Sequence, residues 1–577
     1  MSTTFAAVTA EAAPAGRSES VVDRIGDVVV SEVEWDAPLP ASDAAHPAAC
    51  DRIGFLRYRL ANGPADSSRA DAILSWQPGI TMDAASQQTL AVNSLHQLAD
   101  QGKSAEVWSM SRRNNCLEDR TGAVAALANN DPQIAVDYYF KGGSVDGQTY
   151  HPPTRAEQAW LSDFGSEQVT EDWYFINSHE LPDPAMRKRK LFIGGHSFGG
   201  LLANTYARWV FPDGPGWDQI AGDTVFDTFA DAEPLHRWID AVPGVRQLKD
   251  VFQNLSYSSA VALIKSGLLP ADIGNVLPTG PLGDLLADGG RAIDLDKTTQ
   301  AFADYQTLMN VAAIGARLRP DAESTLPAAI PHNPGLNLVL SALFTQNPLQ
   351  LPGSFVSQQT GLDLPTAVAG TDFRDWRLTN MATLGSLYST SSQPTFFSTQ
   401  MGTFDGPTVP KYFTVPPQIS AIPFLGNTLG AALSFGPTVM PADPTGRLNG
   451  WTDTNIEAKA DAVDVARNVG SGKLDYTTRY ESLRLMVDEF VYIFLGYHGD
   501  GFPELLPEDS IDRVPHVAIT GRLAGSTYDI GWSDPTHEVK VPDRTHMDTL
   551  EGSAEQNDGQ PERVSITVAD FVTRTLG

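Results

Sequence analysis

The alternation of apolar and polar positions in the first part of the chain predicts β-strands that are separated by helices. Residues 54–60 alternate in the manner of an early antiparallel strand, and residues 72–76 have the composition of a buried strand. Residues 106–110 form a further predicted strand, and a helical stretch precedes it. Strands separated by helices indicate a parallel sheet with helices on its faces.

The same pattern continues to residue 227, stops, and returns near the end of the chain. Between about 232 and 478 the chain is rich in Pro, Gly and apolar residues and has helical patches such as 298–314, without a regular alternation of strands and helices. We therefore predict four parts: an N-terminal extension with a peripheral β element at 28–35, a first core part, an inserted and mainly helical cap, and a second core part. Their boundaries are 1–50, 51–231, 232–478 and 479–577. The second core part contains a predicted amphipathic helix (480–494), two strands (514–520 and 538–541) and a terminal helix from about Pro561.

The stretch 190–203 predicts a short strand, a tight G-x-S-x-G turn and the start of a helix, which is the nucleophile elbow of α/β-hydrolases. Ser197 stands at the centre of this turn. Gly195 and Gly199 lie two residues to either side, where a side chain would collide as strand and helix cross, and Gly200 keeps the helix close to the sheet. Ser197 is the predicted nucleophile.

A serine hydroxyl needs a base to become a nucleophile and a third group to hold the base. In this fold the base is a histidine in the loop after the last core strand. His546 occupies that position, between residues 541 and 550, and is the predicted general base. Three other histidines fit less well, because one lies in a strand, one directly precedes a strand and one lies in a turn: His516, His537 and His498.

The acid of the predicted triad has two main candidates. The usual position follows the seventh strand, but the chain has no carboxylate between Gly521 and Asp529. Asp227 stands at the end of the sixth strand, a position that some lipases use. We favour Asp227 over Asp529, and three further carboxylates remain as weaker alternatives: Asp231, Glu233 and Asp534.

The oxyanion hole requires backbone N–H groups that point to the developing negative charge. One donor is predicted at Phe198, directly after the nucleophile, and the other at Gly79 or Ile80 in the loop 76–81 after a core strand. Residues 111–120 are dense in charge and indicate a self-paired, solvated loop.

Composition and charge restrict the partners of the protein. The chain of 577 residues is 42% hydrophobic and 19% charged, as in ordinary globular proteins, and its formal net charge is −30. This charge opposes binding to nucleic acid or to an anionic membrane surface. No apolar run is long enough to span a membrane. The N-terminus lacks the features of an intact secretory signal, which leaves cytoplasmic and secreted locations open.

The chain has two cysteines, Cys50 and Cys116. They are too few for a disulfide scaffold and lack the spacing of a zinc site. A bridge between them and two buried free thiols are both compatible with the sequence.

The G-H-S-F-G turn, the R-R-N-N-C-L-E-D segment, Asp227 and His546 together resemble the capped α/β-hydrolase superfamily over about 50–230 and 480–577. The long cap, the Q-P-G-I loop and the β-forming N-terminal extension resemble the bacterial zearalenone lactonases. That resemblance implies a Ser-His-Asp triad, hydrolysis of a resorcylic macrolactone, and a homodimer or homotetramer.

The expected function is therefore hydrolysis of a bulky, hydrophobic lactone or ester through an acyl-serine intermediate. This chemistry requires no metal and no organic cofactor. The alternatives are a lipase or polyester-cleaving carboxylesterase, and an acyltransferase of the same fold.

Overall fold

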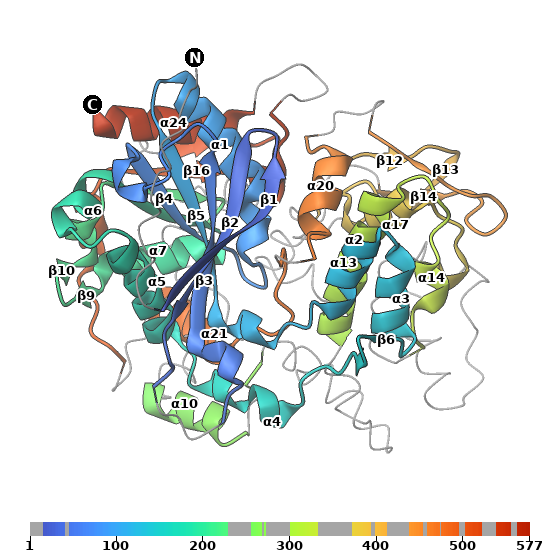
Figure 1. Cartoon of the computed structure of the whole chain (residues 1–577), viewed down its shortest axis with the longest axis horizontal. Helices are drawn as coiled ribbons and strands as arrows, with labels where there is room; N and C mark the ends of the chain where they lie inside the picture. The colour runs from blue at the N-terminus through green and yellow to red at the C-terminus, as the bar shows by residue number, and fades with distance from the viewer. Residues whose placement is uncertain are drawn as a thin grey trace, which may run out of the picture.

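The computed structural model shows a lobe built around a large sheet and a second, mostly helical lobe beside it (Figure 1). The structure describes residues 16–40, 45–228, 256–267, 271–272, 301–332, 372–393, 398–411, 438–453, 459–472, 475–494, 502–521, 538–554 and 562–577.

The central sheet has nine strands in the order β1-β2-β3-β5-β4-β8-β11-β16-β17. Their bounds are β1 Arg17–Ile25, β2 Val28–Asp36, β3 Arg52–Leu60, β4 Ala72–Gln77, β5 Ala105–Ser111, β8 Leu191–His196, β11 Gly222–Phe226, β16 His516–Thr520 and β17 Glu538–Lys540. The pairs β1–β2, β2–β3 and β3–β5 are antiparallel, and every pair from β5 to β17 is parallel. The predicted parallel sheet with an antiparallel beginning is confirmed.

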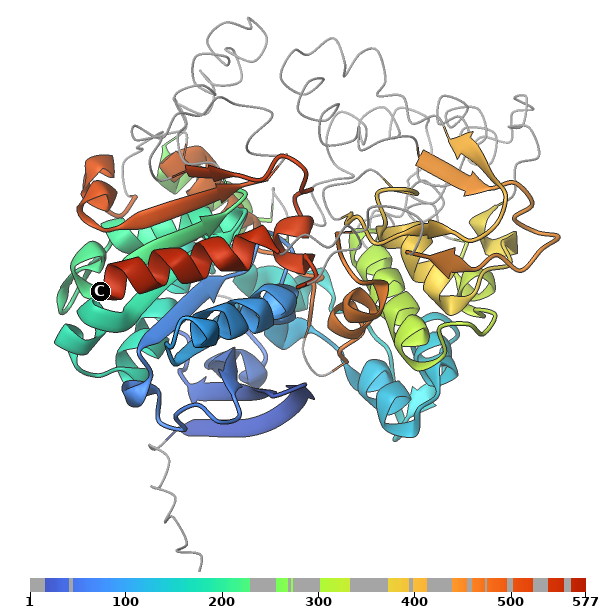
Figure 2. The same cartoon turned by 90° about the horizontal axis from the view of Figure 1, so that it is seen from above.

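Helices cover both faces of this sheet, as the view from above shows (Figure 2). Helices α1 (Gln88–Asp100) and α24 (Arg563–Leu576) pack side by side on one face, and α5 (Ser166–Glu180) and α7 (Phe198–Arg208) pack on the other. Neighbouring side chains of β4 therefore enter different cores, because side chains alternate across a strand. Leu74 belongs to the core under α1 and α24. Ile73 belongs to the core under α5 and α7.

The N-terminal β element is larger than predicted. Strand β2 pairs with β3 over its full length, from Val28 opposite Leu60 to Asp36 opposite Arg52, and lies inside the sheet. The edge strand β1 was not predicted at all. Its residues are mostly exposed or half-buried, so the segment lacks the apolar stripe on which a strand prediction depends.

The second lobe is built around α13 (Ala301–Leu318), which packs against four helices: α2 Thr121–Asn129, α3 Pro132–Phe140, α17 Asn380–Tyr388 and α20 Ala462–Val469. Helix α14 (Leu326–Ala329) and two short ribbons complete its described part, with strands β12 Thr403–Phe404, β13 Thr408–Lys411, β14 Thr438–Pro441 and β15 Trp451–Thr452. The cap boundaries 232–478 stay a prediction. Helices α2 and α3, which the sequence analysis assigned to the core, lie in this lobe (Figure 1).

The helix predicted at 480–494 begins later than expected. Ser482 accepts a hydrogen bond from the backbone N–H of Leu485, and α21 spans Leu483–Met486 before the chain continues as a π-helical segment, Val487–Phe494. Ser482 itself forms an antiparallel bridge to Asp272, which keeps it outside the helix. No helix in the described part of the chain is long and apolar enough to cross a membrane.

Shorter elements connect these units. They include the 3-10 turns η1 Ala48–Asp51 and η4 Arg113–Leu117, the helices α4 Arg155–Gln158, α6 Pro184–Lys190, α10 Tyr257–Lys265 and α23 Asp548–Glu551, and the strands β6 Ser144–Val145, β7 Gln148–Thr149, β9 Val210–Phe211 and β10 Gly214–Pro215.

Candidate active site

Ser197 lies in the sharp turn between β8 and α7, with a strained backbone at φ 54° and ψ −120°. Its backbone N–H donates to the carbonyl of Phe226 at 2.9 Å, which fixes the turn against the neighbouring strand. A Cβ on Gly199 would lie 2.1 Å from the carbonyl oxygen of Gln77, and one on Gly195 would lie 2.5 Å from the carbonyl carbon of Gly199. Contact with backbone, rather than a special dihedral angle, is why these two positions require glycine.

Asp227 and His546 meet at the same edge of the sheet. Asp227 directly follows β11, and its side chain is fully buried. The Nδ1 atom of His546 lies 2.7 Å from the Oδ2 atom of Asp227. Since an ionised carboxylate only accepts, Nδ1 carries the proton of the neutral imidazole and Nε2 keeps its lone pair. The glycine that follows β16 makes room for this pair, because a Cβ on Gly521 would lie 3.1 Å from the carboxyl carbon of Asp227.

The other proposed acids lie outside the described residues. These are Asp529, Asp231, Glu233 and Asp534. His516 lies within β16, where its ring Nδ1 contacts the carbonyl of Val514 at 3.1 Å. Of the carboxylates considered as acids, Asp227 is the one that the structure places against the predicted base.

His196, which the sequence pattern did not indicate as a site residue, contacts His546. The two imidazole rings lie 4.2 Å apart, and Nε2 of His196 donates to the backbone carbonyl of His546 at 3.0 Å. Burial, followed by the neighbouring His546, lowers the pKa of His196 well below its ordinary value. A neutral His196 can therefore donate one hydrogen bond without adding a charge beside the base. Its position inside G-H-S-F-G was the available signal.

The loop that carries His546 is held by a buried carboxylate two residues later. Asp548 accepts the backbone N–H groups of Thr545 and Gln400, both at 2.8 Å, and the side-chain amide of Gln400 at 2.6 Å. The hydroxyl of Thr399 donates to the same carboxylate. Because Thr399 and Gln400 lie between β11 and β16 in the chain, this carboxylate joins that part of the chain to the histidine loop.

Three features define the fold: a mostly parallel sheet with an antiparallel beginning, a strained serine turn after β8, and a histidine loop after the last strand. The fold is that of an α/β-hydrolase. The serine, the histidine and the strand-end aspartate lie at the carboxyl edge of the sheet, where this fold places its chemistry.

The chain is only weakly similar to known proteins. No protein-family model matches the chain, and no curated protein matches it. The peroxisomal α/β-hydrolase Lpx1 of Saccharomyces cerevisiae is 13% identical with a TM-score of 0.22, over 36% of this chain and 47% of that one. The chain thus spans less than half the length of that protein.

Two further solved structures show similar likeness. The acetyl xylan esterase of Paenibacillus sp. R4 is 15% identical with a TM-score of 0.21, covering 44% of this chain and 68% of the other. The juvenile hormone epoxide hydrolase of the silkworm Bombyx mori is 10% identical with a TM-score of 0.24, covering 96% and 77%. At these identities and TM-scores the likeness identifies no substrate and no activity.

The predicted oxyanion residues lie on both sides of the elbow. Phe198 is the first residue of α7, and Gly79 lies against the turn, since a Cβ built on it would be 3.4 Å from Cβ of Ser197. Ile80 follows in the same loop. The interpretation of 111–120 as a solvated loop was wrong. Arg112 and Arg113 have side chains only 1% and 2% exposed, because buried backbone carbonyls of neighbouring segments need their donors.

A cavity of about 260 Å³ lies on the other side of this loop. Asp83 and Arg112 are among its lining residues, and Ser197 and His546 are not. Burial, followed by the charge of Asp475, raises the pKa of the Asp83 carboxyl to about 8. The charged groups around the cavity are largely paired with one another, as Arg120 is with Asp475. We therefore assign the cavity no part in the chemistry.

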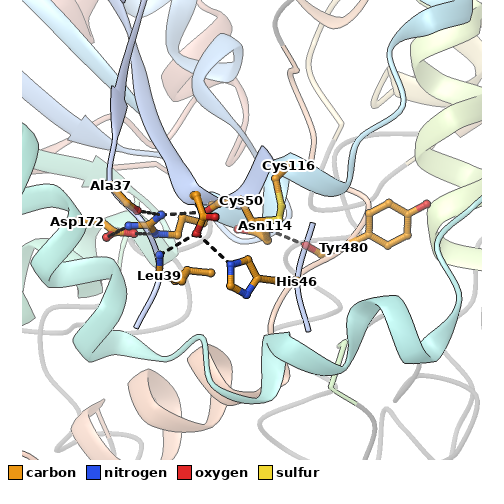
Figure 3. Close-up of a disulfide and its surroundings, with 10 residues drawn as sticks. Ala37, Leu39, His46, Cys50, Asn114, Cys116, Asp172 and Tyr480 are labelled. Carbon is orange, nitrogen blue, oxygen red and sulfur yellow. Dashed lines mark hydrogen bonds and ion pairs between the residues drawn. A yellow bond between two sulfur atoms is a disulfide. The ribbon is translucent and has the colours of Figure 1, made fainter. Parts of the chain in front are cut away.

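The two cysteines form a disulfide that joins η1 to η4 (Figure 3), with 5.1 Å between the Cα atoms of Cys50 and Cys116. Of the two alternatives that the sequence left open, the structure contains the bridge. Within the described residues, no group of three or more His, Cys, Asp or Glu side chains is placed to hold a metal ion.

Proposed function

We propose that the protein is a carboxylic ester hydrolase in which Ser197 is the nucleophile, His546 the general base and Asp227 the acid that orients it. The contact between Nδ1 of His546 and Asp227 at 2.7 Å carries this proposal. It leaves Nε2 of His546 as the basic atom, and both residues stand at the sheet edge that presents Ser197.

The proposed reaction follows from these roles. Ser197 Oγ bonds to the ester carbonyl carbon as its proton moves to Nε2 of His546, and the carbonyl π electrons collect on oxygen. N–H groups of Phe198 and of Gly79 or Ile80 stabilise that oxyanion. The tetrahedral species collapses, the C–O bond to the alcohol breaks, and the alkoxide takes the proton from His546. Water then repeats both steps, which releases the acid and restores Ser197.

Within this activity we propose a bulky, uncharged lactone of the zearalenone type as substrate. The support is the long, Pro-, Gly- and aromatic-rich insertion predicted at 232–478, which is larger than a small ester needs. A lactone also keeps alcohol and acid in one product, so a single exit path is enough. The proposal includes a homodimer or homotetramer, which light scattering of the purified protein would test.

The test is turnover of a substrate panel by the wild-type protein and by Ser197→Ala. We expect the wild type to open zearalenone, to be unaffected by chelators, and to lose activity by a factor on the order of 10⁶ in Ser197→Ala. More than a few per cent of residual activity in the folded variant would contradict the triad. Cleavage of long-chain triglycerides or a polyester film, with zearalenone left intact, would replace the lactonase by a lipase or polyester-cleaving esterase. Faster transfer to an added alcohol than to water would indicate an acyltransferase.

A further inference from the structure

The backbone carbonyls of the loop after β4 converge on one buried arginine. Nη1 of Arg112 donates to the carbonyl of Pro78 at 2.9 Å, and Nη2 donates to the carbonyls of Gly79 at 2.8 Å and Met82 at 3.1 Å. A guanidinium is planar and presents its donors in a fixed fork. One rigid group therefore sets the direction of three carbonyls.

Holding these carbonyls also sets the direction of the N–H groups in the same peptides. In a trans peptide the C=O and N–H bonds point in opposite directions, and the described chain contains no cis peptide. The carbonyl of Pro78 shares its peptide with the N–H of Gly79, and the carbonyl of Gly79 shares its peptide with the N–H of Ile80. Arg112 thus directs both candidate oxyanion donors away from itself.

A second charged residue completes this arrangement. Oε2 of Glu481 lies 2.8 Å from Nη2 of Arg112 and accepts the backbone N–H of Thr81 at 3.0 Å. Thr81 has φ 56°, a left-handed conformation that is costly for a β-branched residue and persists only where its surroundings hold it. Because Glu481 takes the N–H of Thr81, the donors that remain for an oxyanion on this loop are Gly79 and Ile80.

We propose that Arg112 is a positioning residue for the oxyanion hole, and that the Arg112–Glu481 pair fixes the peptides of Gly79 and Ile80 in the donating orientation. The inference rests on the proposed function and deepens it. Donors that are oriented before the reaction stabilise the developing charge without reorganisation, whereas a peptide free to rotate would lose that advantage. Arg112 touches neither the substrate nor the reacting atoms.

The experiment replaces Arg112 and measures both turnover and the affinity for an inhibitor that resembles the tetrahedral transition state. In Arg112→Met we expect kcat/KM for a p-nitrophenyl ester to fall on the order of 10²-fold per active site, with most of the loss in kcat. Inhibition by an alkyl trifluoromethyl ketone, which forms a charged tetrahedral adduct with the serine, should weaken by a similar factor. Titration with a fluorophosphonate counts active sites, so misfolded protein does not enter the comparison.

Arg112→Lys serves as a second variant that keeps the charge opposite Glu481. One ammonium group cannot reproduce the fork, so we expect a folded enzyme with kcat reduced by about tenfold. Wild-type kcat in this variant would overturn the role that we give to the guanidinium geometry, even if Arg112→Met fails to fold.

The neighbouring Arg113 offers a matched control. It is equally buried, pairs with Asp172 at 2.6 Å, and donates to the carbonyls of Ala37 and Cys50 beside the disulfide, not to the oxyanion loop (Figure 3). Arg113→Met should lower the thermal stability as much as Arg112→Met while kcat per active site stays within about threefold. Equal kinetic effects in the two variants would show that Arg112 acts only through stability. If Ser197→Ala keeps full turnover, the proposed function fails independently of either arginine.

Discussion

At the scale of single residues, the position of Asp227 in the sequence suggested it as the acid, and its contact with His546 in the structure supports that choice. Asp227 was favoured because it ends a strand beside the nucleophile, and the structure places its carboxylate on Nδ1 of His546. Its catalytic role stays a prediction. His196 was not recognised, although it stands inside the motif, because a hydrogen bond to a carbonyl 350 positions away leaves no local pattern.

Asp227→Asn should lower kcat on the order of 10³- to 10⁴-fold with little change in the fold. The amide can donate to Nδ1 of His546, which stabilises the wrong tautomer and leaves Nε2 protonated. Steady-state kinetics of Asp227→Asn and Asp529→Asn provide the comparison, and the second variant should be nearly unaffected. The opposite order of losses would move the acid to the position after β16.

Asp223 gives a prediction about pH. Burial raises the pKa of this carboxyl, at the start of β11, to about 7. Between pH 4 and 7 the folded chain therefore holds a proton that the unfolded chain has released, so this group makes the free energy of unfolding fall as the pH rises. Above pH 7 the buried Asp223 carboxylate is charged in both states, and its destabilising contribution to the free energy of unfolding is constant.

In Asp223→Asn that contribution is absent. We expect the melting temperature of the variant, relative to wild type, to be higher at pH 8 than at pH 5, measured by calorimetry at both values. Parallel changes with pH in the two proteins would contradict the assignment. Asp36→Asn, an exposed carboxyl on the same sheet, is the control.

At the scale of elements, the local sequence pattern predicted the strands that are buried on both faces. It missed the start of a helix that depends on pairing with a distant segment. The predicted strands at 72–76 and 106–110 are confirmed as β4 and β5, because a strand buried on both faces needs mostly apolar side chains. The start of the helix predicted at 480 was wrong, since pairing with Asp272 keeps Ser482 outside the helix.

The disulfide should stabilise the connection between η1 and η4. It closes a loop with a sequence separation of 66, for which chain entropy gives about 4 kcal/mol in the unfolded state. We expect Cys50→Ala/Cys116→Ala to unfold in urea with a free energy lower by about 2–4 kcal/mol. A reducing agent should destabilise the wild type and leave the double variant unchanged. If reduction has no effect on the wild type, the bridge is absent in solution.

At the scale of the whole molecule, polar contacts join the segment 399–400 and α20 to the part of the sheet lobe that carries the histidine loop. Thr399 and Gln400 donate to Asp548, while Asn468 of α20 donates to Thr89 of α1 and to Glu551 of α23. Such buried groups must each find a partner, so a shift of the 399–400 segment or of α20 would leave several of them unsatisfied. We infer that Thr399 and Gln400 stay fixed against the histidine loop, and α20 against α1 and α23.

Asp548→Asn tests that inference. The new amide would face donors that need an acceptor, so we expect a loss of about 3 kcal/mol or more in unfolding free energy and a lower kcat. Asp218→Asn is the control, because Asp218 and its partner Lys188 are both exposed and their ion pair, at 3.4 Å, should contribute little. Equal stability of both variants would show that Asp548 does not hold the 399–400 segment against the histidine loop.

The sequence by itself determined the fold class, because the period of apolar positions reflects burial on each face of a strand or helix, and a strand-turn-helix around glycine admits few geometries. It also indicated Ser197, His546 and the strand-end Asp227 as the residues to examine. Only the tertiary structure decided which charges are buried. Arg112 and Glu481 stand 369 positions apart, and nothing in either segment shows that they pair behind the oxyanion loop. Local sequence records local burial, whereas the partner of a buried charge depends on where distant segments meet.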